Sequence, residues 1–254
     1  MSVPALSVFR IPDLPRIEPG ADLAAEIVAA VRKANLEPRP GDIFAIAQKV
    51  VSKAEGRIVD LHDITPSPDA VELAKRADKD PRLVELILNE SRRVVRHVPG
   101  IIIVEHRLGI VLANAGIDRS NVEGDEDVVL LLPENPDASA AKLKQALENQ
   151  FAVRLGVVIT DSVGRPWRLG TTGIAIGCAG VTALDDLRGQ RDLFGRVLQV
   201  AEVATADCVA GAAGLVMGEG AEGAPVVLIR GIDAGDSDQN AAALLRPERE
   251  DLFR

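Results

Sequence analysis

The stretch GVVITDSVGRPWRLGTTGIAIGCAG, residues 156–180, decides how the chain is organised. Residues 157–159 form an uninterrupted β-branched run, which is typical of a buried strand. Asp161 and Ser162 follow, and we expect them at the carboxyl end of that strand, ahead of a glycine-rich loop at 170–173. Such a loop could hold a metal ion and an anion together. The alternative is an ordinary turn, because Asp and Ser commonly open turns.

A second stretch of similar build favours the functional interpretation. Residues 107–122, RLGIVLANAGIDRSNV, run from an apolar segment to a polar tip with Asp118, Ser120 and Asn121. Hard divalent cations such as Mg²⁺ and Mn²⁺ bind through one or two carboxylates and share the other positions with water and phosphates. The sequence therefore predicts that Asp118 and Asp161 form a metal site.

Composition limits the classes of function. The chain has 254 residues, a formal net charge of −9 and a pI near 5.0, so it can bury a large core and lacks the basic surface of a general nucleic-acid binder. An anionic ligand needs a local basic pocket, for which the candidates are Lys49, Lys53, Arg165 and Arg168. For Lys53 alone, contact with a phosphate and a place on a solvated helix face are equally supported.

Cysteine usage and hydropathy indicate a cytoplasmic protein without a membrane anchor. Cys178 and Cys208 are the two cysteines, too few for a disulfide framework or a zinc site. The amino terminus lacks the basic start and long apolar core of a secretory signal. The longest uncharged run, residues 169–184, is too short to span a bilayer.

Hydrophobic periodicity, together with the positions of proline, glycine and helix-capping residues, predicts a mixed α+β chain. We expect helices at 22–34, 69–79, 80–96 and 199–217, a helix capped by Asp137 or Ser139, and strands at 43–46, 101–105, 157–159 and 226–229. Residues 130–137 are the best candidate for a crossing between two lobes. The charged run 184–196 is interpreted as a solvated face or a subunit contact.

Several ordered motifs resemble the coenzyme F420-0:γ-glutamate ligase family, and the resemblance covers nearly the whole chain. The motifs are LPRI at 14–17, QKVVSKAEGR at 48–57, EHRLG at 105–109, AGIDRSNV at 115–122, VVITDSVGRPWRLG at 157–170, MGEGAEG at 217–223 and DLFR at 251–254. The resemblance implies an α+β fold of two lobes that forms an intertwined homodimer. Residues 1–254 would then be one ligase unit without the nitroreductase-like domain that some bacterial members carry.

The resemblance also implies a set of site residues. Asp118, Asp161 and Ser162 would bind a divalent metal, Mg²⁺ or Mn²⁺, with Glu219 as a further ligand. Asp118, Asp161 and Lys53 would be catalytic. The guanine nucleotide would contact Leu14, Pro15, Arg16, Ile17, Gln48, Lys53, Asn121, Met217, Gly218, Glu219, Gly220, Ala221, Glu222, Gly223 and Ala224.

By the same resemblance, the enzyme would add L-glutamate to F420-0 through an acyl phosphate made from GTP, with K⁺ as an additional ion. No GxxxxGK[ST] stretch occurs, so the nucleotide is not expected in a P-loop. Two rival functions remain open on the residues alone. One is a metal-dependent phosphohydrolase that uses Asp118 and Asp161, and the other is a nucleotide-sensing oligomer without turnover.

Overall fold

The computed structural model describes residues 5–120, 126–233, 235 and 237–251. Its centre is a five-stranded sheet in the order β1-β12-β2-β8-β9. β2 and β8 run parallel, whereas the other neighbours are antiparallel, so the sheet is mixed. The strands are β1 (Ser7–Arg10), β2 (Ile43–Ala47), β8 (Gly156–Arg165), β9 (Arg168–Ala179) and β12 (Val226–Arg230). The predicted strands at 43–46, 157–159 and 226–229 are confirmed.

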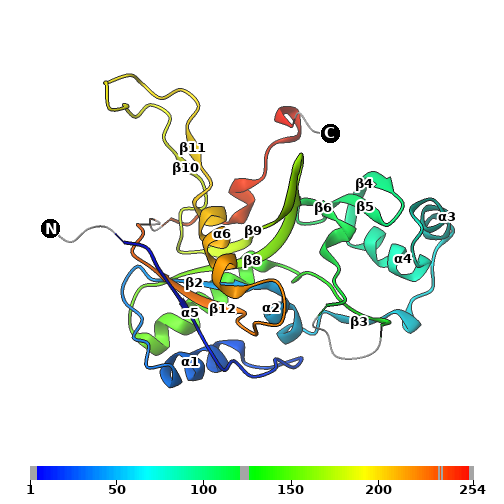
Figure 1. Cartoon of the computed structure of the whole chain (residues 1–254), viewed down its shortest axis with the longest axis horizontal. Helices are drawn as coiled ribbons and strands as arrows, with labels where there is room; N and C mark the ends of the chain where they lie inside the picture. Colours follow the sequence, from blue (N-terminus) through cyan, green and yellow to red (C-terminus); the bar gives the residue numbers. More distant parts are fainter. Residues whose placement is uncertain (1–4, 121–125, 234, 236, 252–254) are drawn as a thin grey trace.

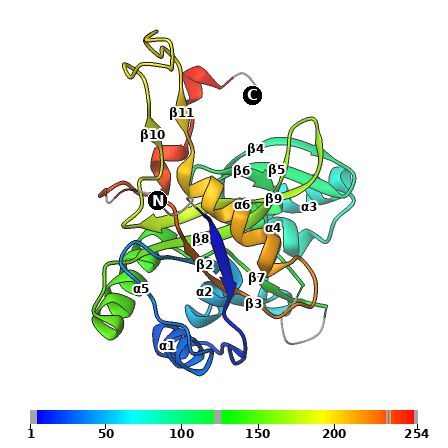
Figure 2. The same cartoon turned by 60° about the vertical axis from the view of Figure 1, so that its left-hand side comes forward.

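Helices cover both faces of this sheet because its strands alternate in side-chain direction. Phe44 and Ile46 of β2 pack in the core cluster that also contains residues of α1, α2 and α5, whereas Ile43 and Ala45 pack with α6. Figures 1 and 2 show α1 and α5 below the sheet and α6 above it. The helices are α1 (Leu23–Lys33), α2 (Gln48–Ala54), α5 (Pro136–Phe151) and α6 (Thr205–Met217).

A three-stranded sheet forms a separate layer at one end of the molecule (Figure 1). α3 and α4 pack on it around a buried cluster that includes Ile87 and Ile102. A two-stranded sheet, β3 with β7, lies beside it. The elements are β3 (Ile58–Asp60), η1 (Leu61–Asp63), α3 (Pro68–Ala77), α4 (Pro81–Asn89), β4 (Ser91–Val98), β5 (Ile101–His106), β6 (Val111–Ala113), η2 (Asn114–Gly116) and β7 (Val128–Leu130).

The prediction of one helix over 80–96 is wrong in its second half. Asp80 does cap the helix, because its carboxylate accepts from the Arg82 amide at 2.8 Å, but α4 ends at Asn89. Residues 91–98 form β4, which pairs with β5. The three valines of SRRVVRHV favour a strand, because β-branched side chains fit a pleated surface better than a helix.

A buried carboxylate at the junction of α4 and β4 explains where the helix stops. Glu90 Oε2 lies 2.7 Å from an Arg57 guanidinium nitrogen, 3.1 Å from Arg107 Nη2 and 3.5 Å from His106 Nε2. Burial opposes ionisation, but contacts with His106 and Arg57 hold the pKa of Glu90 below its usual value. The same Arg57 donates to the carbonyl of Leu132 at 2.9 Å, and Leu132 packs in the core cluster beneath the main sheet, so this cluster connects the end layer to that core.

β8 and β9 form one long hairpin, which corrects two expectations. Asp161 and Ser162 lie within β8 instead of beyond its end, and the predicted loop at 170–173 is part of β9. Cross-strand pairing continues through Gly164 opposite Thr171 and, after a register shift, to Arg165 opposite Arg168. The reason is that hydrogen bonds from the neighbouring strand β8 hold residues 170–173 in an extended conformation. The local sequence of glycine and threonine does not indicate this pairing.

The cap of α5 differs from the prediction as well. Asn135 caps the helix by accepting from the Ala138 amide at 3.1 Å, and Pro136 occupies the first turn. Asp137 instead accepts from the amides of Cys178 and Ala241, each at 2.9 Å. The helix expected at 22–34 is confirmed, with Asp22 as its cap.

The helix predicted over 199–217 begins only at Thr205. Residues before it belong to an arm, defined here as residues 185–203, which is closed by pairing of β10 (Asp185–Asp186) with β11 (Glu202–Val203). Figures 1 and 2 show the arm standing away from the body. Its exposed hydrophobic residues are Leu193, Phe194, Val197, Val200 and Val203.

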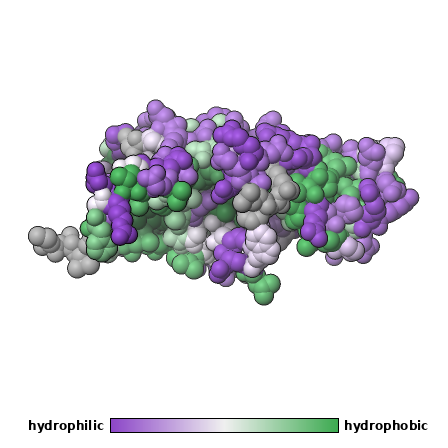
Figure 3. All heavy atoms as spheres, turned by 90° about the horizontal axis from the view of Figure 1, so that it is seen from above, coloured by the Kyte–Doolittle hydropathy of each residue, from purple (hydrophilic) through white to green (hydrophobic). Residues whose placement is uncertain are grey.

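The chain continues past β12 in short 3₁₀ turns, η3 (Ala241–Leu244) and η4 (Glu248–Glu250). Seen from the side of the arm, the surface is mainly hydrophilic with separate hydrophobic patches (Figure 3). In the described residues, no helix is both long and apolar enough to cross a membrane.

Gly177 of β9 marks a close approach that only glycine allows. A Cβ atom at this position would lie 2.4 Å from the Pro136 carbonyl carbon and 2.5 Å from its oxygen. Gly177→Ala should therefore lower the free energy of unfolding by about 1–3 kcal/mol, because the start of α5 must move away from β9. Urea unfolding measures this. Gly164→Ala, on the same hairpin with no atom within 4 Å, is the control, and an equal loss in both variants would contradict the prediction.

Candidate active site

Asp161 lies where β8 leaves the core. The preceding residues of the strand are buried, and the Asp161 side chain is partly covered. Burial raises the pKa of Asp161 to about 6; the carboxylates of Asp118 and Glu219 push it in the same direction, and Lys49 opposes them. The charges of Asp118, Glu219 and Lys49 therefore lie near enough to Asp161 to influence its ionisation.

Asp118 is held by contacts on both of its carboxylate oxygens. Lys49 Nζ lies 2.6 Å from Oδ2, and the Ser120 amide donates to Oδ1 at 2.6 Å. Lys49 also donates to the Ser120 hydroxyl at 2.6 Å. Burial disfavours the charged carboxylate, but these donors outweigh it and lower the pKa of Asp118. At neutral pH the site therefore contains an ionised Asp118 paired with a cation.

Backbone pairing fixes the position of Asp118. Its amide donates to the Leu130 carbonyl at 3.0 Å, and the Leu130 amide donates back at 2.8 Å. Leu131 in turn donates to the carbonyl of Arg57 at 3.0 Å. The loop carrying Asp118 is thereby attached to β7 and, through Arg57, to the buried Glu90 cluster.

Ser162 and Glu219 meet across the sheet surface. The Ser162 hydroxyl donates to Glu219 Oε1 at 2.6 Å. Glu219 belongs to the loop that follows α6, and Met217 anchors the start of that loop, lying buried with its sulfur 3.9 Å from the Thr160 hydroxyl. Sequence positions that lie 57 residues apart are therefore adjacent at this site.

The rest of the predicted nucleotide loop is exposed between two buried ends. Met217 and Ala224 are buried, whereas residues 218–223 face solvent. The loop closes on itself, because the Glu222 carboxylate accepts from the Gly220 amide at 2.8 Å. Gly218 has φ +74°, and a Cβ there would meet the Glu222 side chain. The glycines therefore permit a tight loop with accessible backbone.

The other predicted nucleotide contacts lie in residues 14–17, before α1, and on α2. Ile17 is buried and Leu14 packs against the same core, whereas Pro15 and Arg16 are exposed. Gln48 is buried, and its carbonyl oxygen accepts from the Ser52 hydroxyl at 2.9 Å. Asn121 lies outside the described residues.

α2 presents two lysines on one side. Lys49 and Lys53 are four residues apart, a spacing that places both on the same helix face. Gln48 and Ser52 occupy the buried face. The sequence singled out Lys53, but it is Lys49 whose ammonium group contacts Asp118. The four-residue spacing of the two lysines could have indicated from the sequence that Lys49 shares a helix face with Lys53.

The donor set suits a hard divalent cation. Asp118, Asp161 and Glu219 would supply carboxylate oxygens and Ser162 a hydroxyl, the ligand types that Mg²⁺ and Mn²⁺ prefer. Burial is the main cause of the raised pKa of Asp161, and the negative charges of Asp118 and Glu219, which a cation would offset, add to it. Among the described residues, no three His, Cys, Asp or Glu side chains already form a metal cluster. A two-carboxylate site completed by water and substrate oxygens is compatible with that arrangement.

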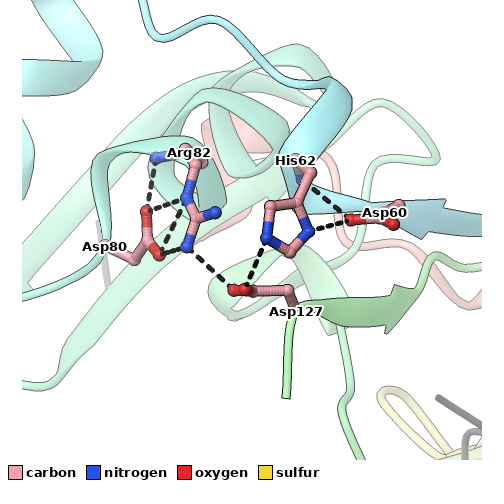
Figure 4. Close-up of polar contacts among 5 residues, drawn as sticks. All are labelled: Asp60, His62, Asp80, Arg82 and Asp127. Carbon is pink, nitrogen blue, oxygen red and sulfur yellow. Dashed lines mark hydrogen bonds and ion pairs between the residues drawn. The ribbon is translucent and has the colours of Figure 1, made fainter. Parts of the chain in front are cut away.

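A second polar cluster supports the Asp118 region from outside. His62 lies between Asp60 Oδ1, 2.8 Å from Nδ1, and Asp127 Oδ2, 3.3 Å from Nε2, while Arg82 bridges Asp127 and Asp80 (Figure 4). Asp127 directly precedes β7. These contacts connect α4 and η1 to the start of β7, and Leu130 of β7 pairs with Asp118.

The comparisons with known proteins agree with this architecture. The family model described as F420-0:Gamma-glutamyl ligase matches residues 12–231. Coenzyme F420:L-glutamate ligase of Methanothermobacter thermautotrophicus is 44% identical over 98% of this chain and 99% of the relative. The enzyme of that name from Methanopyrus kandleri is 46% identical over 99% of each chain, and that of Methanocaldococcus jannaschii is 47% identical over 84% of this chain and 85% of the relative.

The protein is therefore an enzyme of the ligase class, which forms C–N bonds. The chain belongs to the F420-0:γ-glutamyl ligase family, and the resemblance seen in its motifs is confirmed.

Proposed function

We propose that this enzyme joins L-glutamate to the carboxylate of coenzyme F420-0 in coenzyme F420 biosynthesis, using GTP and a divalent metal ion. The observation that carries the proposal is the cluster of Asp118, Lys49 and Asp161, in which two carboxylates and a cation lie near the point where β8 leaves the core. The names of the relatives, coenzyme F420:L-glutamate ligase, support the choice of substrates.

The chemistry requires an activated acyl group because a carboxylate is a poor electrophile. A carboxylate oxygen of the precursor would attack the γ-phosphorus of GTP, and GDP would leave with the electron pair of the broken P–O bond. The glutamate amine would then attack the acyl carbon, inorganic phosphate would leave, and the amine would lose a proton. This sequence yields one amide, one GDP and one phosphate, and each further glutamate would repeat it with γ-linkage.

The residues of this chain have distinct tasks in that scheme. Asp118, Asp161, Ser162 and Glu219 would hold the divalent ion, Mg²⁺ or Mn²⁺, which when bound offsets charge on phosphate oxygens. Lys49 neutralises Asp118 in the free enzyme and would turn toward phosphate when the metal binds. The second lysine of the face, Lys53, would contact the nucleotide, and K⁺ would add to the charge balance there.

The nucleotide would lie along the loops that border this cluster. The exposed stretch 218–223 offers backbone amides, and Glu219 of that loop already reaches Ser162. Pro15 and Arg16 are accessible from solvent, with Leu14 and Ile17 fixing the segment to the core. Gln48 is buried at the start of α2 and accepts a hydrogen bond from Ser52, on the helix face away from both lysines.

The arm makes a homodimer part of the proposal. Two short strands joined by a long loop are marginally stable alone, and Leu193 and Phe194 at its tip are 99% and 86% exposed. Hydrophobic side chains gathered in this way indicate a protein contact. We place the arm against a second copy of the chain, and we keep the two-lobed division at 130–137 as part of the same proposal.

Mass spectrometry tests the proposed function. F420-0 incubated with enzyme, GTP, Mg²⁺ or Mn²⁺ and L-glutamate should gain the mass of one or more glutamate residues, with GDP formed in equal amount. Omission of glutamate should stop product formation. Phosphate release without an amide product would instead indicate a phosphohydrolase, and nucleotide binding without either product a sensor.

Lys49 and Lys53 give a sharper test of the cluster. Lys49→Ala and Lys53→Ala should each lower kcat/KM for GTP by roughly 10- to 100-fold, because each removes a charge-assisted contact of about 1.5–3 kcal/mol. Initial rates at saturating glutamate and metal measure this. Lys75→Ala, an exposed lysine on α3, is the control and should stay within about twofold. A twofold effect in all three variants would remove both lysines from the site.

A further inference from the structure

A cavity of about 310 Å³ lies along the outer edge of the main sheet. Its floor is β9, the edge strand, and its walls come from the turn before β6, the start of α5 and the segment that contains η3. The size is at the lower end of the range for small-molecule sites. The lining is mostly aliphatic, with Leu108, Ile110, Ile174, Ile176 and Leu245 as its main apolar side chains.

Carboxylates already satisfy the edge of β9 along this floor. Asp207 accepts from the Ala175 amide at 2.8 Å, and Asp137 accepts from the amides of Cys178 and Ala241 at 2.9 Å. These bonds block addition of another strand at those amides. They also fix the floor and one wall before any ligand arrives, so the cavity is preformed.

The pairing of β8 with β9 brings the cavity next to Asp161 of the carboxylate cluster. Ile174 is the direct cross-strand partner of Asp161, and such partners project from the same face about 5 Å apart. Ile174, Leu108 and Ile110 pack against one core cluster. A ligand in the cavity could therefore extend one end over β8 to Asp161.

Charge selects which substrate can enter. The titratable groups that line the cavity are Asp137, Asp207, Asp251 and Arg246, three acids against one base. Such a site disfavours the phosphates of a nucleotide and the two carboxylates of glutamate. A planar, uncharged ring suits the aliphatic walls, and the acids can accept hydrogen bonds from ring N–H or O–H groups.

We propose that this cavity binds the planar heteroaromatic ring of the carboxylate substrate, with the carboxylate end of that substrate directed to Asp161. The inference rests on the proposed function for the identity of the substrate. It adds a site lined by β9, the start of α5 and the segment that contains η3, so that the nucleotide and the precursor approach the cluster from different elements.

Filling the cavity tests the proposal. Ala242 lines it, is exposed and lies in η3, so Ala242→Trp should block the space while the protein folds. Binding of F420-0 without GTP or glutamate is followed by titration of its ring absorbance or fluorescence. The Kd should rise at least tenfold, whereas the Kd for GTP, measured by calorimetry, should change less than twofold. Val111→Glu, at the exposed rim, should give the same pattern by adding charge.

Ala141→Trp on the exposed side of α5 is the matched control and should change neither Kd. An unchanged Kd for F420-0 in both cavity variants would overturn the inference, as would an equal rise in the Kd for GTP. Light scattering provides a further outcome: loss of dimer mass in both cavity variants would assign the cavity to a second copy and also overturn it. Ring binding that depends on the cavity without amide formation by the parent enzyme would refute the proposed function alone.

Discussion

Replacing Asp161 by asparagine is expected to abolish amide formation, with kcat/KM for GTP at least about a thousandfold below the parent. The variant loses a carboxylate from the proposed metal site, and several kcal/mol of transition-state stabilisation depends on such an ion. Product is measured by mass spectrometry at saturating metal and glutamate. Asp118→Asn should behave in the same way because Asp118 supplies the other carboxylate.

The same substitution should stabilise the unliganded protein. Since the folded-state pKa of Asp161 is raised from 3.8 to about 6, the folded protein holds this proton more tightly than the unfolded chain. The stability contributed by the group is therefore lost as pH rises from about 4 to 6 and stays lost above it. At pH 8 without metal, Asp161→Asn should regain up to about 3 kcal/mol, seen as a higher Tm.

Loss of activity with gain of stability separates a functional carboxylate from a structural one. Asp186→Asn is a suitable control, because Asp186 pairs with Arg188 on the exposed arm and should affect ligation little. Full activity of Asp161→Asn would remove Asp161 from the site. A lower Tm at pH 8 would show that the carboxylate stabilises the fold and would contradict the electrostatic argument.

The largest effect on stability is expected at Glu90. Glu90→Gln should lower the free energy of unfolding by about 3–5 kcal/mol, because it removes the buried carboxylate that balances the partly buried guanidinium groups of Arg57 and Arg107. Thermal unfolding at neutral pH measures this, and the Tm should fall by roughly 10 °C. The loss should reach the site as well, since Arg57 supports the segment that pairs with Asp118.

An exposed ion pair in the same region is the matched control for Glu90. Glu248 contacts Arg93 at 2.7 Å, but both side chains are largely in solvent. Glu248→Gln should change the free energy of unfolding by less than about 1 kcal/mol. Equal changes for Glu90→Gln and Glu248→Gln would show that burial of the cluster carries no energetic weight.

Local patterns predicted the elements whose causes are local. Asp22 and Asp80 cap helices because a cap needs only a side-chain oxygen and the amides two or three residues ahead. The apolar runs at 43–46 and 157–159 are buried strands because both faces of the sheet are covered. The motifs along the chain also identified the family, since their order is a property of the sequence itself.

Elements that depend on distant partners were predicted wrongly. α4 stops at Asn89 because Glu90 is drawn to Arg57, 33 residues away, and β4 then finds β5. Residues 170–173 extend as a strand because β8 lies beside them. Asp137 does not cap α5, because amides of β9 and η3 compete for its carboxylate.

The sequence by itself determined the mixed α+β composition, the family and the two carboxylates of the candidate site. Those follow from residue types and their spacing along the chain. Only the tertiary structure decided that Lys49 is the lysine that contacts Asp118, that Ser162 meets Glu219 and that a cavity adjoins Asp161 through Ile174. The physical reason is that charge pairing, burial and strand register act between segments far apart in sequence, and their partners are set only when the sheet has formed.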